Sequence, residues 1–383
     1  MVKERAILRT PGPTPVPERV QAAMSKPMIG HRSEEFPELF RTAERLKPIF
    51  GTKQDVFILS SSGTSALEAA VVNTVSPGEE VTVVVAGAFG DRFASICERF
   101  GAVTHRLDVP WGEACSREAL AEHIRQHPDV KAVFVTYCET STGVINPVAE
   151  LAKTVRENSE ALFIVDGVSC IGGVPAEMDA WGIDILVTGS QKAMMLPPGL
   201  AFVSVSERAW EVIEQNAAPS FYLDLRAYRD SYAKGMTPYT PAISLINGLS
   251  EVCSIIEEEG FENVILRHEA MKDMTRAAVQ ALGLQLLTED SDASPTVTAI
   301  AANESLDTEQ LRKLVKEKYN ISFAGGQKKL KGRLLRIGHM GWCFPSDVLT
   351  AITFIELGLQ KINVDIEAGA GVKAAEEVYL NYV

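Results

Sequence analysis

One lysine lies between two apolar runs in the segment "DILVTGSQKAMMLPPGLAFVSVS", residues 184–206. Residues 185–187 and 202–205 predict two short buried strands, and the Pro-Pro-Gly turn at 197–199 predicts a sharp bend between them. Lys192 at such a bend can point into a cleft, where removal from water lowers the pKa of its ammonium group. The neutral amine is then a nucleophile for carbonyl carbons, as in Schiff-base chemistry. The alternative is an ordinary solvated loop lysine.

A turn rich in hydroxyl groups precedes a helical pattern in "SSSGTSALEAA", residues 60–70. Unpaired backbone N–H groups and the positive end of the helix dipole make such a helix N-terminus a site for phosphate or another anion. The alternative is that Ser62 or Thr64 only caps the helix. The segment has neither the Gly-Lys-Ser/Thr of a Walker loop nor Gly-x-Gly-x-x-Gly, which disfavours nucleoside triphosphates and dinucleotides.

A single aspartate ends the apolar run "ALFIVDG", residues 161–167. Ligands of open α/β sheets collect at the carboxyl ends of strands, so Asp166 can meet Lys192 at one edge. The alternative role for Asp166 is to close a local turn. A carboxylate can also hold a proton on a heteroaromatic nitrogen. A phosphate cradle, a carboxylate and a lysine amine are together the three partners that pyridoxal phosphate needs.

The elements that must position these residues alternate between strand and helix patterns. The strand runs are apolar throughout, which is typical of a mostly parallel sheet covered by helices on both faces. A long helical pattern from residue 244 to 282 is followed by mixed strands and helices, which predicts a smaller α+β domain. We expect an extended, proline-rich segment at 1–20 that drapes over the surface, a large domain at 21–250 and a small domain at 251–383. The predicted strands are 56–59, 81–85, 132–136, 161–167, 185–187, 202–205, 285–287, 296–301 and 334–337.

Composition narrows the class of protein. The 383 residues are 46% hydrophobic and carry a formal net charge of −13, which disfavours binding to nucleic acid or to anionic membranes. The six cysteines are scattered without Cys-x-x-Cys pairs or zinc-like spacing, so we expect reduced thiols, no metal site and a cytoplasmic location. The N-terminus lacks an apolar signal core, and no run is long enough to predict a membrane span.

Seven motifs, in order, resemble the class V aminotransferases of fold type I. The chain is most similar to the group of serine–pyruvate and alanine–glyoxylate aminotransferases. The resemblance implies a large domain with a mostly parallel seven-stranded sheet, a smaller α+β domain, bound pyridoxal 5'-phosphate, and a homodimer with shared active sites. The motifs are "TPGPTPVPERV" with "GHRSEEF", "SSSGTSALEAA", "CETSTGVINP", "IVDGVSCIGG", "DILVTGSQKAMMLPPGLAFVSVS", "TPYTPAISL" and "LLRIGHMG".

Position by position, the resemblance also implies roles for individual residues. Lys192 matches the catalytic lysine that binds the cofactor's aldehyde, Asp166 the partner of the pyridine nitrogen, and Arg336 the arginine that binds the substrate α-carboxylate. Taken alone, Arg336 is better explained as an ordinary charge on an edge strand, and the ordered set of motifs is what favours a role in the site. The remaining matches surround the family's cofactor: Ser62, Gly63 and Thr64 in the phosphate loop, Phe89 stacked on the ring, Thr140 with its hydroxyl near the cofactor, Val168 under the ring, Gln191 before the lysine and in contact with the cofactor, and Thr237 or Thr240 reaching the partner subunit's phosphate.

The implied reaction is a ping-pong transamination between a small amino acid and a 2-oxo acid. Alanine, serine or aspartate is the expected donor, and glyoxylate or pyruvate the expected acceptor. Alternatives on the same fold are a cysteine desulfurase, a β-lyase and a 2-aminoethylphosphonate–pyruvate transaminase. A desulfurase needs a mobile nucleophilic cysteine, and Cys343 is the cysteine near a candidate site residue. A catalytically silent α/β binding protein is the alternative outside the enzymes.

Overall fold

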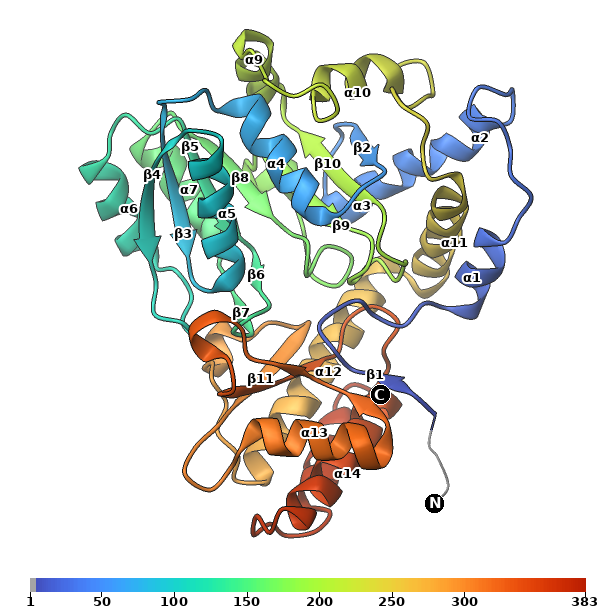
Figure 1. The fold of residues 1–383 in the computed structure, drawn as a ribbon, viewed down its shortest axis with the longest axis vertical. Coiled ribbons are helices and arrows are strands. Elements are labelled where there is room, and N and C mark those ends of the chain that lie inside the picture. The colour runs from blue at the N-terminus through green and yellow to red at the C-terminus, as the bar shows by residue number, and fades with distance from the viewer. Residues whose placement is uncertain (1–4) are drawn as a thin grey trace.

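A seven-stranded sheet forms the centre of the molecule in the computed structural model, which describes residues 5–383 (Figure 1). Its strand order is β2-β10-β9-β8-β5-β3-β4, and all strands run parallel except β10, which is antiparallel to both of its neighbours. This confirms the predicted α/β class and mostly parallel sheet. The strands are β2 (Val56–Leu59), β3 (Glu80–Val85), β4 (Val103–Asp108), β5 (Ala132–Thr136), β8 (Leu162–Asp166), β9 (Ile185–Gly189) and β10 (Ala201–Val205).

Helices cover both faces of the sheet and explain why its central strands are apolar throughout. In β8, Phe163 and Val165 enter the core on one face, while Leu162 and Ile164 enter the core on the other. Successive strand residues point to opposite faces, so every position of such a strand is buried. No helix within residues 5–383 combines the length and the apolarity needed to span a membrane. The helices around the sheet are α4 (Gly63–Thr74), α5 (Ala88–Arg99), α6 (Arg117–Gln126), α7 (Val148–Asn158), α8 (Met178–Trp181), α9 (Glu207–Gln215) and α10 (Leu225–Tyr232).

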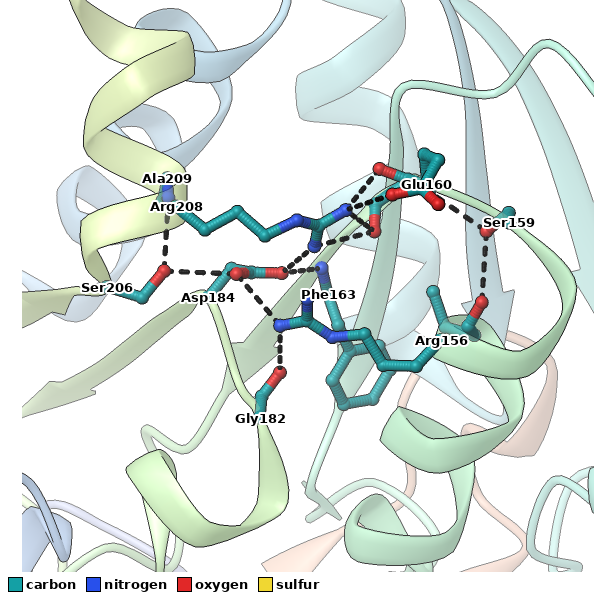
Figure 2. A network of polar contacts seen from close by, with 11 residues as sticks. Arg156, Ser159, Glu160, Phe163, Gly182, Asp184, Ser206, Arg208 and Ala209 are labelled. Carbon is teal, nitrogen blue, oxygen red and sulfur yellow. Dashed lines mark hydrogen bonds and ion pairs between the residues drawn. The ribbon is translucent and has the colours of Figure 1, made fainter.

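A buried carboxylate fixes the start of β9, as Figure 2 shows. Asp184 is fully buried and accepts hydrogen bonds from the backbone N–H of Phe163 (2.8 Å) and the hydroxyl of Ser206 (3.0 Å). The guanidinium groups of Arg156 and Arg208 lie 3.1 and 2.9 Å from its two oxygens. Charge-assisted bonds of this kind are stronger than neutral ones. Asp184 therefore joins β8, α7 and the start of α9 to the strand whose other end leads to Lys192.

The N-terminal segment is tied to the rest of the protein by strand pairing and by a few buried side chains. The short strand β1 (Ile7–Leu8) pairs in parallel with β12 (Ile321–Ser322), and Arg9 is buried in an ion pair with Asp347. The side chain of Thr14 is also buried. Buried backbone N–H and C=O groups outside sheets and helices still need hydrogen-bond partners. Here other loops supply those partners. Further N-terminal elements are α1 (Glu18–Met24), α2 (Phe36–Phe40), the 3-10 helix η1 (Arg41–Leu46) and α3 (Lys47–Phe50).

The C-terminal part has a three-stranded antiparallel sheet of order β11-β14-β13 and lies below the central sheet in Figure 1. The predicted helix from 244 to 282 is two helices, because Gly260 adopts a positive φ of 85° between them. Residues 285–287 form no strand and contribute one bridge, from Leu286 to Ile300. β6 (Cys138–Glu139) and β7 (Val144–Ile145) form a separate two-stranded sheet in the middle of the chain. The C-terminal elements are α11 (Ile243–Glu259), α12 (Phe261–Ala281), η2 (Asp290–Asp292), β11 (Val297–Ala301), α13 (Thr308–Tyr319), β13 (Ala324–Gly325), η3 (Lys328–Leu330), β14 (Leu334–Gly338), α14 (Pro345–Lys361) and α15 (Ala370–Tyr379).

Candidate active site

Lys192 lies on the loop that connects β9 to the antiparallel β10. The loop closes on Ser190, whose hydroxyl donates to the Pro197 carbonyl (2.7 Å) and accepts from the Leu200 N–H (3.1 Å). Met195 adopts a left-handed conformation with φ of 55°, which an apolar side chain rarely occupies. Because β10 runs back beside β9, the loop stays at the carboxyl end of the parallel strands. This is the edge at which the sequence predicted Lys192.

The Lys192 amine lies among groups that favour its neutral form. Burial, and then the positive charge of Arg336, lower its pKa to about 8. Its Nζ donates a hydrogen bond to the Pro11 carbonyl (2.5 Å), and the Thr14 hydroxyl donates to its own carbonyl (3.0 Å). A Cβ at Gly12 would lie 2.4 Å from Lys192 Cδ, so only glycine leaves room for the lysine there. The residue is only partly buried.

Asp166 ends β8, the strand next to β9, and is 3% exposed. Its Oδ1 accepts a hydrogen bond from the Val168 N–H (2.9 Å), and burial raises its pKa to about 6. None of the ion pairs within residues 5–383 includes this carboxylate. A buried carboxylate without a cation is costly. A ligand that presents a protonated nitrogen would compensate for that cost.

The N-terminus of α4 is open toward the same edge. Ser62 is its N-cap in an extended conformation, but its side chain makes no capping hydrogen bond, so the simple capping alternative does not hold for Ser62. Gly63 begins the helix, and a Cβ there would lie 2.9 Å from the side chain of Val168. Next to it, Gln191 has a buried Oε1 that has no hydrogen-bond partner in the described part of the chain. Thr64 is partly exposed at this end. The open N–H groups at the start of α4 fit an anion that accepts hydrogen bonds, whereas the Gln191 oxygen can only accept a hydrogen bond from a donor of the ligand.

Phe89 is the second residue of α5, and its backbone is held by a carboxylate that sequence reasoning did not single out. Glu139 is fully buried and accepts from the N–H groups of Phe89 and Gly90 at 3.0 Å and from the N–H and hydroxyl of Ser141. Burial raises its pKa. The adjacent Thr140 hydroxyl lies 2.7 Å from that of Ser169. Glu139 lies within the motif "CETSTG", so its position beside Thr140 was the available signal.

Arg336 lies on β14, the central strand of the small sheet, and is 4% exposed. The alternative of an edge-strand charge is therefore wrong. Its guanidinium donates two hydrogen bonds to the Gly325 carbonyl (2.9 and 2.8 Å) and one to the Thr140 carbonyl (2.8 Å). Burial lowers its pKa to about 10. The ion pairs within residues 5–383 do not include Arg336, so a carboxylate is the partner that its charge lacks.

Thr237 and Thr240 lie apart from this edge. They line a hollow of about 510 Å³ together with His31, Arg32 and Lys234. Neither Lys192 nor Asp166 lines that hollow. A single chain therefore gathers the other predicted residues at the sheet edge. The two threonines lie instead in a separate hollow that is lined by basic side chains.

Comparisons with known proteins agree with this geometry. The family model for class V aminotransferases matches residues 8–343. The chain is 42% identical to a protein named "Soluble hydrogenase, small subunit" from Synechococcus sp., over 98% of this chain and 99% of that one. It is 38% identical to the L-aspartate–glyoxylate aminotransferase of Paracoccus denitrificans, over 96% of this chain and 95% of that one. The crystal structure of ureidoglycine–glyoxylate aminotransferase from Bacillus subtilis matches with a TM-score of 0.93 at 32% identity, covering 100% of both chains.

The chain belongs to the class V aminotransferase family. It is a transaminase of the kind that depends on pyridoxal phosphate, which confirms the resemblance seen in the sequence and sets aside the silent binding protein.

Replacing Lys192 with methionine should stabilise the cofactor-free protein by about 2 kcal/mol at neutral pH, after a discount for partial exposure. The folded pKa of about 8 lies below the ordinary 10.5, so folding penalises the ammonium form. The penalty is complete below about pH 8 and disappears as the pH rises to about 10.5. Denaturant unfolding at neutral pH and near pH 10 measures it. The exposed Lys53→Met is the control, and a gain that does not fall with pH would contradict the lowered pKa.

Proposed function

We propose that this protein transfers an amino group from a small amino acid, such as alanine, serine or aspartate, to glyoxylate or pyruvate. The observation that carries the proposal is the sheet edge at which Lys192, Asp166 and Arg336 are held by the fold without ionic partners among residues 5–383. Pyridoxal phosphate and an amino acid together present the complementary groups: a phosphate, a protonated ring nitrogen, an electrophilic carbon and a carboxylate.

The residues present fit pyridoxal phosphate. Its phosphate would lie at the N-terminus of α4, with Gly63, Thr64 and Ser62 as donors. Asp166 would hold the ring nitrogen. Phe89 and Val168 would contact the ring, and the Thr140 hydroxyl would lie close to it. When bound, the cofactor supplies an electron-accepting ring for the electrons of a broken bond at the substrate's Cα.

The chain's own groups then perform positioning and proton transfer. The Lys192 amine, with its pKa near 8, can accept the proton of the substrate's Cα and return it close to neutral pH. Asp166 stays anionic opposite the protonated nitrogen, because a nearby positive charge favours the carboxylate. The planar fork of Arg336 orients the substrate's α-carboxylate. The backbone bonds of Glu139 hold Phe89 in place.

Glyoxylate is our preferred acceptor. The Paracoccus and Bacillus relatives are both named as glyoxylate aminotransferases. The reaction follows a ping-pong course, in which the keto acid leaves before the acceptor binds.

The test separates the two half-reactions. The loaded enzyme should lose its visible colour when alanine, serine or aspartate is added alone, with release of one equivalent of the matching 2-oxo acid per site. Glyoxylate or pyruvate should restore the colour and yield glycine or alanine. Lys192→Ala should fold and lose steady-state turnover, because the proton carrier is gone. Turnover of that variant without added amine would overturn its role.

The alternative reactions predict other products. A β-lyase releases ammonia and a desulfurase releases sulfide from cysteine, both without an acceptor. Cys343 is 1% exposed, and burial raises its pKa to about 11, which does not suit a mobile nucleophile. 2-Aminoethylphosphonate has no α-carboxylate, and its phosphonate is one carbon further from the amine-bearing carbon, so it would not meet Arg336 where an α-carboxylate does.

Arg336→Lys should weaken every donor and acceptor together. Each substrate shares the α-carboxylate, and a flexible ammonium cannot reproduce the guanidinium fork. Loss of one charge-assisted bond costs about 1.5 to 3 kcal/mol, or roughly 10- to 150-fold in kcat/KM. The measurement is kcat/KM for two unlike donors and two acceptors. The exposed Arg333→Lys is the matched control, and a loss confined to one substrate would show that Arg336 reads a side chain instead.

We also propose a homodimer in which each active site uses both chains. The hollow at Thr237 and Thr240 is lined by three residues with basic side chains, His31, Arg32 and Lys234, and lies away from the Lys192 edge of its own chain. A phosphate bound at the partner's α4 is a suitable anion for it.

Subunit complementation tests this arrangement. Lys192→Ala and the double variant Thr237→Val with Thr240→Val should each have low activity. If sites are shared, refolding the two together gives mixed dimers with one fully native site and restores activity. Mixed dimers in which every site remains defective would show that each chain builds its site alone.

A further inference from the structure

Three of the protein's six histidines gather far from the proposed active site. His105 lies on β4, and His123 and His127 lie at the C-terminal end of α6. His105 Nε2 is 2.8 Å from Oε2 of Glu80, the first residue of β3. The rings of His105 and His127 stack at 3.7 Å between centroids, and those of His123 and His127 are 4.7 Å apart.

The cluster has the chemistry of a metal site. One ligand atom each from Glu80, His105 and His127 lies within 4.8 Å of the other two. Side-chain rotations that separate the stacked rings of His105 and His127 would bring such atoms to the distances of about 2.0 to 2.2 Å at which Zn²⁺ binds imidazole and carboxylate. Two imidazoles and one carboxylate suit zinc and similar transition metals, whereas magnesium and calcium prefer oxygen ligands alone.

His123 gives a second, independent indication. Its Nε2 is buried and has no hydrogen-bond partner among residues 5–383. A buried polar atom normally has a hydrogen-bond partner, since a buried polar atom without a hydrogen bond costs free energy. A simple His–Glu contact between Glu80 and His105 accounts for neither His123 nor His127.

We propose that Glu80, His105 and His127 bind one divalent transition-metal ion, with His123 available as a further ligand. The ion would join three elements, β3, the edge strand β4 and α6. β4 has a neighbouring strand on one side only, so a cross-link to α6 stabilises an exposed margin of the sheet.

The role is structural and not catalytic. Glu80 begins β3, whereas the residues of the active site follow the carboxyl ends of the parallel strands. A strand of six residues separates the two ends by about 20 Å. Sequence spacing predicted no metal because the ligands come from three separate elements.

The test uses Zn²⁺ and tag-free loaded enzyme, dialysed against a chelator and freed of unbound cofactor. Titration calorimetry at neutral pH should show one Zn²⁺ per chain, and the melting temperature should rise with the logarithm of Zn²⁺ concentration. Mg²⁺ at equal concentration should do neither. The six thiols are all buried and do not compete in the folded protein.

His105→Gln and His127→Gln should each weaken Zn²⁺ binding at least about 10-fold, while transamination remains unchanged. Glu80→Gln keeps a hydrogen bond to His105 but removes the anionic ligand, so it tests the site even if a histidine variant folds poorly. Glu118→Gln, an exposed change on α6, is the matched control and should bind as the parent does. Absence of stoichiometric binding in the parent, or equal binding in all variants, would overturn the proposal.

Discussion

The reversal of direction between β9 and β10 is the constraint on which the proposed site depends. A parallel successor to β9 would need a crossover that carried the chain to the opposite end of the sheet. An antiparallel β10 lets the loop turn back at once, so Lys192 remains beside Asp166 and the N-terminus of α4. The close contact of Gly63 with Gly189 and Val168 follows from the same crowding at one edge. Asp184 anchors the other end of β9 and so keeps this edge in register.

Rigid support is what allows charged groups to be held without ionic partners. Asp166 and Arg336 are both buried, and both use hydrogen bonds to the backbone alone. The surrounding protein therefore carries an electrostatic cost in the ligand-free state. The pKa values of Lys192, Asp166 and Arg336 are all shifted in the direction that favours the neutral form of each group. Sites of this kind trade stability for the ability to bind complementary charges.

Much of the fold and of the candidate site could be predicted from the sequence wherever a local pattern carries the information. The buried strands β5, β8 and β9 have uninterrupted apolar runs, and the motifs around Lys192 and Asp166 lie at their ends. The strand β4 was missed because, as an edge strand with His105 and Arg106, it lacks such a run. The break at Gly260 was hidden by helical periodicity on both sides. Glu139 and the histidine cluster depend on contacts between distant elements, which no local pattern records.

The N-terminal segment gives the site an order of assembly. β1 begins at residue 7, yet its partner β12 begins at residue 321 and is made much later. The contact of Pro11 with the Lys192 amine joins positions 181 apart. Domains tend to form as units during synthesis, so the central sheet can fold while the first residues still await their partner. The environment of the nucleophile is thus completed only after synthesis has passed residue 321, and a shorter nascent chain does not present it.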